Sequence, residues 1–545
     1  MDVPGVRARS LLRPVLVLPL AWLVTVLVNV TKAVHMDDST YLILARQILQ
    51  DPLHPLSGAI VLSGESWPAS WVNQPPLLLY GFAAVMAVFG ESELALHVFL
   101  SLFSAAAILL FHALARRLCP RHALALTLAF ALGPALLPGQ NLMTDVPLVA
   151  LWLAFFWLLM CGGETRAPRY VAAAAVAAVA CLVKYTSLVL VPLLLVPVVA
   201  RREERYAGVV AIPVAVLAAW SIWNLLDYGE VHLFTRVAHA GEHSPFLERV
   251  EAWLKCLGGV APFSIALAPL FTRHRRTLLL LTGSAALVGL LYHGSLDAEA
   301  GLTPILKALF LANGLLVMLV TGAALGRRPG ERREDVALLA GWFVAGTLFP
   351  VLLAPFMAVR HVLPVIPALL LVLGRWSEGP GATRWLRAGV GLSVLLGVAL
   401  AAADWQYADV FRTQAGALRE RFGAQARLWY LGDWGWRWYA EAQGMEHYLN
   451  ESSVLRSGDL VIIPQATAGP NGVARRDQPR VRLIDVVEPR PPSWFLPRIM
   501  LPFPRGGYYA VGSEGLPWTF SRTPLERILV FRVGEERRAA PERPR

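Results

Sequence analysis

The sequence is poor in charge and in cysteine. Only 16% of its 545 residues are Asp, Glu, Lys or Arg, whereas 56% are hydrophobic, and a soluble globular protein averages about 25% charged residues. All four cysteines lie within the first 256 residues, so no disulfide framework is available to the rest of the chain. These shortages exclude a single soluble enzyme and a disordered chain, and they give no sign of redox chemistry.

The few charges are spread unevenly. Residues 404–545 carry 36 of the 87 charged side chains, about 25% of that segment, whereas residues 1–403 carry 51, about 13%. This division predicts a membrane-embedded part over 1–403 and a small soluble α/β domain over 404–545, with strands at 427–431, 459–463, 481–487, 508–511 and 527–533. Six aromatic residues between 429 and 439 could stack on sugars, but packing in a core and at the membrane surface is favoured.

Long apolar stretches predict an α-helical polytopic membrane protein with about 13 crossings. Crossing about 30 Å of hydrocarbon takes roughly 20 apolar residues. Such stretches occur near 14–31, 94–115, 122–140, 146–161, 207–226, 250–271, 277–293, 303–325, 336–356, 362–374 and 386–403. The run at 170–200 is too long for one helix and predicts a hairpin with Lys184 at its tip. The 14 apolar residues at 77–90 are too few to cross, which predicts an interfacial or re-entrant helix.

The basic residues indicate an orientation. If 77–90 does not cross, the N-terminus and the loops on its side of the membrane hold 21 Lys and Arg, and the opposite side holds 6. The positive-inside rule makes the richer side cytoplasmic. We therefore expect a multi-pass protein of the cell (inner) membrane with its N-terminus in the cytoplasm. The long loop 32–93 and the C-terminal domain then lie outside, and the net charge of +11 describes orientation and no nucleic-acid partner.

The acidic external loop 32–93 is the first place to expect chemistry, because long loops are usually functional. Asp37 and Asp38 directly follow the first span, and their mutual repulsion could raise one pKa into a range that suits a general base. Capping of a helix N-terminus is the alternative. Asp145, at the external start of the span 146–161, either caps that helix or faces the same cavity as Asp37.

Two cationic positions lie near the ends of predicted spans. Lys184 is one of only four lysines and sits between apolar halves, where a charge costs about 2.5–3.5 kcal/mol and indicates a function by default. Arg360 and His361 stand at the external mouth of the span 362–374. Snorkelling or anchoring at the interface explains each of them separately. If Lys184 and Arg360 converge, they form a site suited to a phosphate at the bilayer surface.

Two further motifs have weaker support. Gln74 precedes a pair of prolines that opens the interfacial helix, with Tyr80 one turn inside, and a structural role is the default there. His239, Glu242 and His243 have the H-x-x-E-H spacing of zinc ligands. Gly241 lies inside that motif and no third ligand can be assigned, so a polar external loop is favoured over a divalent metal.

At these residues the sequence resembles the GT-C class of polyprenyl-phosphate-sugar glycosyltransferases, near the protein O-mannosyltransferases and the bacterial aminoarabinose transferases. The resemblance rests on Asp37 and Asp38 followed by Tyr41, on residues 75–77, on Thr144 with Asp145, on residues 184–185 and on residues 360–364. It covers most of the chain and implies a GT-C-like transmembrane domain, with a polyprenyl-phosphate sugar as donor and a glycan, lipid or protein as acceptor.

The resemblance also implies roles for single residues. Asp37 would act as the base at the acceptor hydroxyl, with Asp38 in place of the usual Glu and Asp145 as a further carboxylate. Gln74 stands where family members often carry Lys or His, which leaves Lys184, Arg360 and His361 as candidates for the donor phosphate. Gln74, Tyr41 and Tyr80 are the candidates for contacts with substrate. No cofactor is required by this chemistry, and a divalent metal is the one candidate.

The implied reaction is coherent on physical grounds. Phosphate is a competent leaving group when cations stabilise its growing charge. An acceptor hydroxyl that attacks the anomeric carbon while Asp37 takes its proton predicts inversion by single displacement. Two other classes stay open: a secondary transporter, against which the long acidic loop and the external domain argue, and a non-catalytic membrane protein that binds lipid-linked glycan, which only an assay separates.

Overall fold

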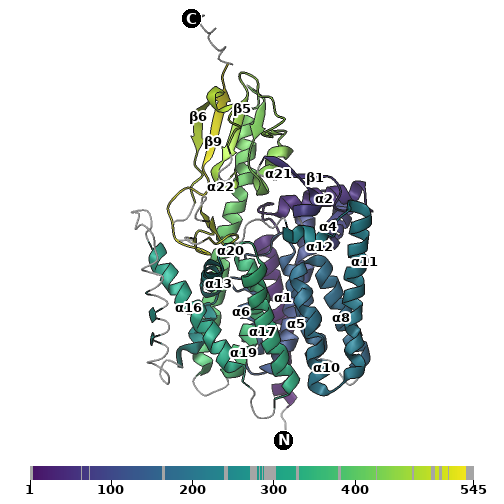
Figure 1. Ribbon diagram of the computed structural model, residues 1–545. Coiled ribbons are helices and arrows are strands. Elements are labelled where there is room, and N and C mark those ends of the chain that lie inside the picture. The colour runs from purple at the N-terminus through teal and green to yellow at the C-terminus, as the bar shows by residue number, and fades with distance from the viewer. Residues whose placement is uncertain are drawn as a thin grey trace, which may run out of the picture.

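Long helices form a bundle, and the C-terminal domain stands on one end of it, opposite the N-terminus (Figure 1). The computed structural model describes residues 4–62, 64–72, 74–161, 166–238, 244–269, 279–280, 283–284, 287, 302–326, 331–377, 382–424, 426–468, 472–491, 497–501, 506–512 and 515–535. Within them, 7 helices are long and apolar enough to cross a membrane: Glu93–Leu118, Arg166–Val183, Glu204–Tyr228, Thr303–Ala324, Arg333–Leu353, Val359–Trp376 and Thr383–Phe422. The chain is thus a helical membrane protein with a sheet-containing C-terminal region, and the number of thirteen crossings stays a prediction.

The helices follow the predicted spans in order. They are α1 (Pro4–Asn29), α2 (Asp38–Gln50), α3 (Ala69–Val72), α4 (Leu77–Phe89), α5 (Glu93–Leu118), α6 (Ala123–Ala131), α7 (Asp145–Cys161), α8 (Arg166–Val183), α9 (Leu190–Leu193), α10 (Leu195–Arg201), α11 (Ala211–Tyr228), α12 (His232–Ala238), α13 (Phe246–Val260), α16 (Thr303–Ala324), α17 (Arg333–Leu353), α18 (Val359–Val362), α19 (Ile366–Trp376) and α20 (Ala382–Phe422). Five 3-10 turns are described as well: η1 (Tyr185–Val189), η2 (Glu204–Val210), η3 (Pro262–Leu267), η4 (Leu363–Val365) and η5 (Gln478–Arg480).

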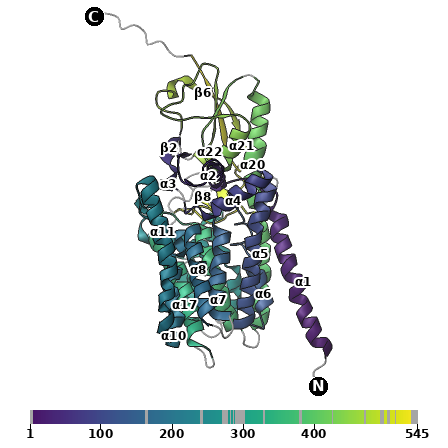
Figure 2. The same ribbon diagram turned by 90° about the vertical axis from the view of Figure 1, so that its right-hand side faces the viewer.

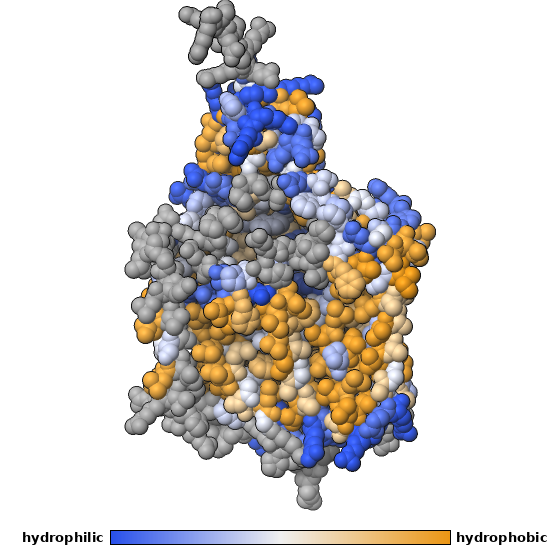
Figure 3. Space-filling view, in the orientation of Figure 1, coloured by the Kyte–Doolittle hydropathy of each residue, from blue (hydrophilic) through white to orange (hydrophobic). Residues whose placement is uncertain are grey.

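The surface of the bundle has the hydropathy expected of a membrane protein. A belt of hydrophobic side chains covers the visible face of the bundle, and hydrophilic side chains gather below the belt, near the N-terminal end (Figure 3). Figure 2 shows α1 running along the edge of the bundle from that end to the level of α2 and α4. Since α2 and α4 lie at the end that carries the C-terminal domain, the loop 32–93 and this domain share one side.

Local sequence explains several helix ends. The hairpin at 170–200 breaks where it was predicted, because α8 ends at Val183 and Lys184 is extended, with φ −159° and ψ 129°, before η1 begins. The helix α5 begins after Ser92, whose side chain accepts a hydrogen bond from the amide of Ala95, a common cap. The span predicted at 250–271 is interrupted, since α13 ends at Val260 and η3 opens with Pro262. The span at 277–293 lies largely outside the described residues.

The apolar segment at 77–90 forms α4, a helix of 13 residues. It packs against α2 at the domain-bearing end of the bundle, and Leu78, Leu79, Phe82, Ala83 and Met86 are buried in this contact region. At about 1.5 Å per residue, such a helix covers about 20 Å, less than the hydrocarbon thickness. The helix α4 is thus as short as the sequence predicts, and its interfacial position stays a prediction.

The C-terminal region contains a mixed sheet of five strands in the order β4-β3-β5-β9-β6. Its strands are β3 (Leu428–Tyr430), β4 (Glu446–His447), β5 (Leu460–Pro464), β6 (Val481–Val487) and β9 (Ile528–Val533). The strand β3 runs parallel to β4 and β5, whereas β9 is antiparallel to β5 and β6. The helices α21 (Trp434–Ala442) and α22 (Gln465–Ala468) accompany it. Four predicted strands are thus confirmed, and five of the six aromatic residues between 429 and 439 are buried.

The strand predicted at 508–511 is wrong. Tyr508 and Tyr509 form a turn after β8 (Gly506–Gly507), which pairs with β7 (Met500–Leu501). Both tyrosine side chains are buried, and the amide of Val511 bonds to the carbonyl of Met357 in the bundle. An aromatic pair buried by a turn has the same local pattern as a short strand, so sequence alone could not separate the two.

The helix α20 runs without a break from Ala382 to Phe422 and thus crosses the predicted domain boundary at 403/404. The lower part of α20 lies in the bundle and its upper part reaches the sheet (Figure 1). A continuous helix joins the two parts more rigidly than a loop would. The remaining hairpin, β1 (Ala59–Leu62) with β2 (Glu65–Pro68), belongs to the loop 32–93.

Candidate functional site

Asp37 faces Arg360. Asp37 precedes the first turn of α2, but its side chain makes no capping hydrogen bond. Instead, Arg360 Nη1 in α18 donates to Asp37 Oδ2 at 2.8 Å. The Asp37 side chain remains 40% exposed, whereas that of Arg360 is 15% exposed. The capping alternative therefore does not account for Asp37, and this carboxylate is both paired and accessible.

A second pair joins Asp145 to Lys184. Asp145 opens α7, and Lys184 lies at the tip of the hairpin that follows α8. Lys184 Nζ donates to Asp145 Oδ1 at 2.7 Å, with side-chain exposures of 14% and 6%. Arg360 links the two ion pairs, because it lies close enough to attract the carboxylates of both Asp37 and Asp145. Two carboxylates and two cations, far apart in the sequence, thus form one charge cluster.

Tyr41 and His361 border this charge cluster. Tyr41 lies one turn into α2, is 7% exposed, and has the carboxylates of Asp37 and Asp145 nearby. Burial above all, together with these negative charges, raises the pKa of the Tyr41 hydroxyl, so it remains a hydrogen-bond donor at neutral pH. His361 follows Arg360 and lies near Lys184, Arg360 and Asp145. The Nε atom of Arg360 is buried without a hydrogen-bond partner among the described residues, which leaves one donor for a ligand.

Asp38 belongs to a different environment. Its side chain is fully buried, and Asp38 Oδ2 accepts a hydrogen bond from the amide of His35 at 3.1 Å and lies 3.6 Å from His35 Nδ1. Burial raises the pKa of the Asp38 carboxyl. Since successive residues of a helix are rotated by about 100°, neighbours in sequence point to different surroundings. Asp38 stands beside His35 and Lys32, both of which contact Asp404, and sequence reasoning singled out neither Lys32 nor Asp404.

The candidates on α4 contact the external loop. The Tyr80 hydroxyl donates to the carbonyl of Pro52 at 2.6 Å, and its ring is 37% exposed. Gln74 is half-buried before the turn that starts α4. These contacts place Tyr80 against the segment between α2 and β1, and a role of either residue in binding substrate stays a prediction.

The metal candidates cannot be placed, because His239, Glu242 and His243 lie outside the described residues. Elsewhere in the described part of the chain, no group of three or more His, Cys, Asp or Glu side chains is arranged to hold a metal ion. The four cysteines are free and buried or half-buried.

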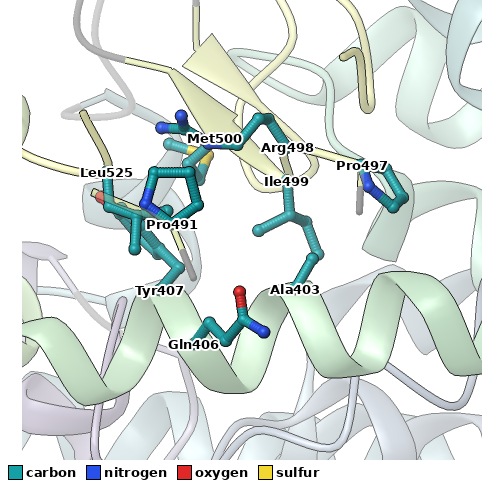
Figure 4. A pocket seen from close by; sticks show the side chains of 9 residues that line it. All are labelled: Ala403, Gln406, Tyr407, Pro491, Pro497, Arg498, Ile499, Met500 and Leu525. Atoms are coloured by element: carbon teal, nitrogen blue, oxygen red, sulfur yellow. The ribbon is translucent and has the colours of Figure 1, made fainter. Parts of the chain in front are cut away.

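A hollow of about 260 Å³ lies between α20 and the C-terminal region. Gln406 and Tyr407 of α20 line it from below and Pro491, Ile499 and Leu525 from above, with the amide of Gln406 pointing into it (Figure 4). It shares no lining residue with the charge cluster of Asp37, Asp145, Lys184 and Arg360. Arg498 also lines it, but its guanidinium donates to the carbonyls of Thr523 and Pro524, and the other lining residues offer little to recognise a phosphate.

A family model described as dolichyl-phosphate-mannose-protein mannosyltransferase matches residues 73–223. The resemblance to this family is confirmed over that segment. The match contains Gln74, Tyr80, Asp145 and Lys184, and Asp37 and Arg360 lie on either side of it. It supports the interpretation of the chain as a membrane glycosyltransferase. No curated protein matches the sequence.

Two solved structures resemble this chain at low sequence identity. ArnT from Cupriavidus metallidurans bound to undecaprenyl phosphate is 16% identical, with a TM-score of 0.40, over 84% of this chain and 93% of that one. The Archaeoglobus fulgidus oligosaccharyltransferase in complex with Zn and sulfate is 12% identical, with a TM-score of 0.46, over 82% of this chain and 68% of that one.

Proposed function

We propose that the protein is an inverting glycosyltransferase that moves a sugar from a polyprenyl-phosphate donor to an acceptor hydroxyl on the external face of the cell membrane. The observation that carries the proposal is the charge cluster of Asp37, Asp145, Lys184 and Arg360 at the end of the bundle that bears α2, α4 and the C-terminal domain. The family match supports the donor class, since dolichyl phosphate is a polyprenyl phosphate.

Lys184 and Arg360 serve the donor in this proposal. The guanidinium of Arg360 has a buried Nε without a hydrogen-bond partner in the described part of the chain, and the flexible ammonium of Lys184 can turn from Asp145 to a phosphate oxygen. Charge-assisted hydrogen bonds of this kind are the strong ones. They stabilise the charge that grows on the phosphate as its bond to the anomeric carbon breaks, so no general acid is needed.

Asp37 serves the acceptor. Its Oδ2 bonds to Arg360, and its 40% exposed side chain can accept the proton of an incoming hydroxyl. When the donor phosphate draws Arg360 toward itself, Asp37 loses part of its ion pair and becomes a stronger base. Donor binding therefore activates the base, which limits proton removal to the complex that holds the sugar. Asp145 keeps Lys184 in place until the phosphate arrives.

The test is transfer of a radiolabelled sugar from undecaprenyl-phosphate donors to acceptors in membranes of cells that express the protein. We expect Asp37→Asn to lower the rate at least 100-fold, since a general base contributes about 10²–10⁴-fold. The anomeric configuration of the product, measured by NMR, should be opposite to that of the donor. An Asp37→Asn protein that transfers sugar at the rate of the unchanged protein would remove the assigned role.

Asp51→Asn is the matched control. Asp51 is a carboxylate of the same external loop, its side chain is 48% exposed, and it pairs with His54 instead of the charge cluster. Its loss should change the transfer rate by less than about twofold, because it contacts none of the four charges. Equal losses in both variants would mean that the loop tolerates no charge change, and the effect of Asp37→Asn would then not be specific.

A further inference from the structure

The segment that leads into Asp37 is held by a buried ionic network. Lys32 and Asp404 are fully buried, and Lys32 Nζ donates to Asp404 Oδ2 at 3.0 Å, to the side-chain oxygen of Asn141 at 2.6 Å and to the carbonyl of Pro138 at 3.0 Å. The other oxygen of Asp404 lies 3.0 Å from His35 Nε2. One carboxylate on α20 thus binds two residues of the five that precede Asp37.

The C-terminal region contacts the same segment, which leads into Asp37, from the other side. The Tyr439 hydroxyl in α21 accepts a hydrogen bond from the amide of Val34 at 2.8 Å and donates to Glu93 at 2.7 Å. Gly435 packs so closely that a Cβ atom there would lie 2.1 Å from the carbonyl oxygen of Val34. Only glycine allows this approach of two backbones.

The backbone between the network and Asp37 is strained. Met36 has a φ of 51°, a conformation that residues with side chains seldom adopt and that persists only when the surroundings enforce it. His35 precedes Met36, and Asp38 follows Asp37. His35 and Asp38 contact each other, and His35 also contacts Asp404 of the network. The direction in which the Asp37 side chain points is therefore fixed by the contacts of Lys32, Val34, His35 and Asp38.

The network also reaches the second carboxylate. Asn141, which Lys32 binds, lies four residues before Asp145, and Met143 between them contacts Arg360 Nη1 through its sulfur at 3.8 Å. The Tyr508 hydroxyl donates to the carbonyl oxygens of Pro134 and Ala135 in the same connection. The C-terminal region and α20 thus hold both loops from which the acidic residues of the charge cluster come.

We propose that Asp404, together with Lys32 and Tyr439, acts as a positioning device that holds Asp37 against Arg360, so that α20 and the C-terminal domain are part of the catalytic unit. None of the three touches the reacting atoms. They act through residues 32–38, and the inference rests on the proposed function only for its effect on the reaction.

The charges of the network explain why Asp404 is central. Burial opposes protonation of His35, but the charge of Asp404 and the hydrogen bond to Asp38 outweigh it and raise the pKa of His35. Lys32, His35, Asp38 and Asp404 are all fully buried in this network, and Asp404 is the carboxylate that contacts both Lys32 and His35. Other groups near His35 are His97 on α5 and the ring of Tyr509, whose centroid lies 5.4 Å away. Loss of the Asp404 charge removes the carboxylate that both Lys32 and His35 contact, and the buried ammonium of Lys32 then keeps only the neutral oxygens of Asn141 and Pro138.

The experiment compares Asp404→Asn with the unchanged protein in two independent measurements. Asp404→Asn keeps the shape of the side chain and removes its negative charge. We expect the transfer kcat to fall about 10–100-fold, because displacement of a catalytic group by about 1 Å can cost this much, while the KM for the undecaprenyl-phosphate donor stays within about threefold. Hydrogen–deuterium exchange of residues 32–41 should accelerate at least tenfold. Tyr439→Phe, which removes one hydroxyl, is the milder second variant and should accelerate the same exchange at least threefold.

Asp335→Asn is the matched control, because Asp335 is a buried carboxylate that pairs with Arg117 elsewhere in the bundle. It should lower thermal stability without changing kcat or the exchange of 32–41 by more than about twofold. Unchanged exchange in both Asp404→Asn and Tyr439→Phe, or equal losses of kcat in Asp404→Asn and Asp335→Asn, would overturn the inference. If the unchanged protein transfers no sugar while exchange accelerates in Asp404→Asn, the proposed function fails and the anchoring of Asp37 stands.

Discussion

Arg360 and Lys184 are each paired with a carboxylate, so in the proposed reaction a donor phosphate has to compete with Asp37 and Asp145 for them. Competition of this kind lowers the affinity of the free site but makes it selective, because a ligand without negative charge cannot displace the carboxylates. Arg360 offers a planar fork of donors and Lys184 a mobile point charge. The proposed phosphate site therefore gives the two residues separate tasks.

Removal of both cations should abolish donor binding. We expect Lys184→Ala with Arg360→Ala to weaken the binding of undecaprenyl phosphate in detergent at least 100-fold, since a hydrogen bond to a charged group contributes about 1.5–3 kcal/mol. Arg360→Lys should lose less affinity, because it keeps the positive charge and loses only the planar set of hydrogen-bond donors. Binding is measured by the quenching of tryptophan fluorescence, and a double variant with unchanged affinity would remove the phosphate site.

Arg117→Ala controls for the loss of a buried ion pair, since Arg117 donates two hydrogen bonds to Asp335 outside the charge cluster. This variant should bind undecaprenyl phosphate within about twofold of the unchanged protein.

The importance of a single residue can be predicted from the sequence where its charge contrasts with apolar neighbours. Lys184 and Arg360 stand out as charges in apolar sequence, and the structure pairs them with Asp145 and Asp37, two carboxylates that the sequence also singles out. Lys32 carries the same signal, because it directly follows an apolar span, yet it counted only as one of the external basic residues. Its partner Asp404 lies 372 positions away, and no local pattern announces a contact over that distance.

The helices α13 and α16 approach each other closely at two glycines. A Cβ atom on Gly258 would lie 1.8 Å from the carbonyl oxygen of Phe310, and one on Gly314 would lie 2.2 Å from that of Leu254. The Asn313 amide donates to the carbonyl of Gly258 at 2.8 Å. Small residues that let two backbones meet, with a polar side chain between them, are typical of helix pairs in membranes.

The substitution Gly258→Ala should separate α13 from α16. Its methyl group meets backbone atoms that cannot turn away, so we expect a loss of at least about 1–3 kcal/mol and a lower midpoint of thermal unfolding in detergent. Gly322→Ala, on the partner helix α16, is the control, since a Cβ atom there meets nothing within 4 Å and alanine favours helix. Equal midpoints for the two variants would contradict the close contact.

Helices and strands can be predicted from the sequence where the length of an apolar run alone defines them. The hairpin break at Lys184, the short helix α4 and four strands of the sheet follow from apolar runs and the residues that interrupt them. The break of the span 250–271 after Val260 was missed although Pro262 marks it, because a run of apolar residues masks a change of helix type. The order of the strands depends on contacts between β3, β4, β5, β6 and β9, which periodicity does not contain.

At the scale of the whole molecule, the helix α20 makes one unit of the bundle and the C-terminal region. Asp404 lies on α20 inside the network that leads to Asp37, and Arg412, two turns later, contacts Glu93 at the start of α5. A boundary at 403/404 was drawn from charge density, which changes there because the chain leaves the apolar belt. Charge density describes the solvent around a segment, and it does not describe how the segments are joined.

Orientation is the remaining question at this scale, and cysteine labelling tests it. Ser457 is exposed on the C-terminal region, and Ala167 is exposed at the start of α8 near one of the basic clusters. We expect a membrane-impermeant maleimide to label Ser457→Cys on spheroplasts and to label Ala167→Cys only after detergent is added, because the positive-inside rule places the basic side in the cytoplasm. The unchanged protein, whose four cysteines are buried or half-buried, serves as the background control. Labelling of Ala167→Cys alone would reverse the orientation, and a donor on the external face would then no longer reach Asp37.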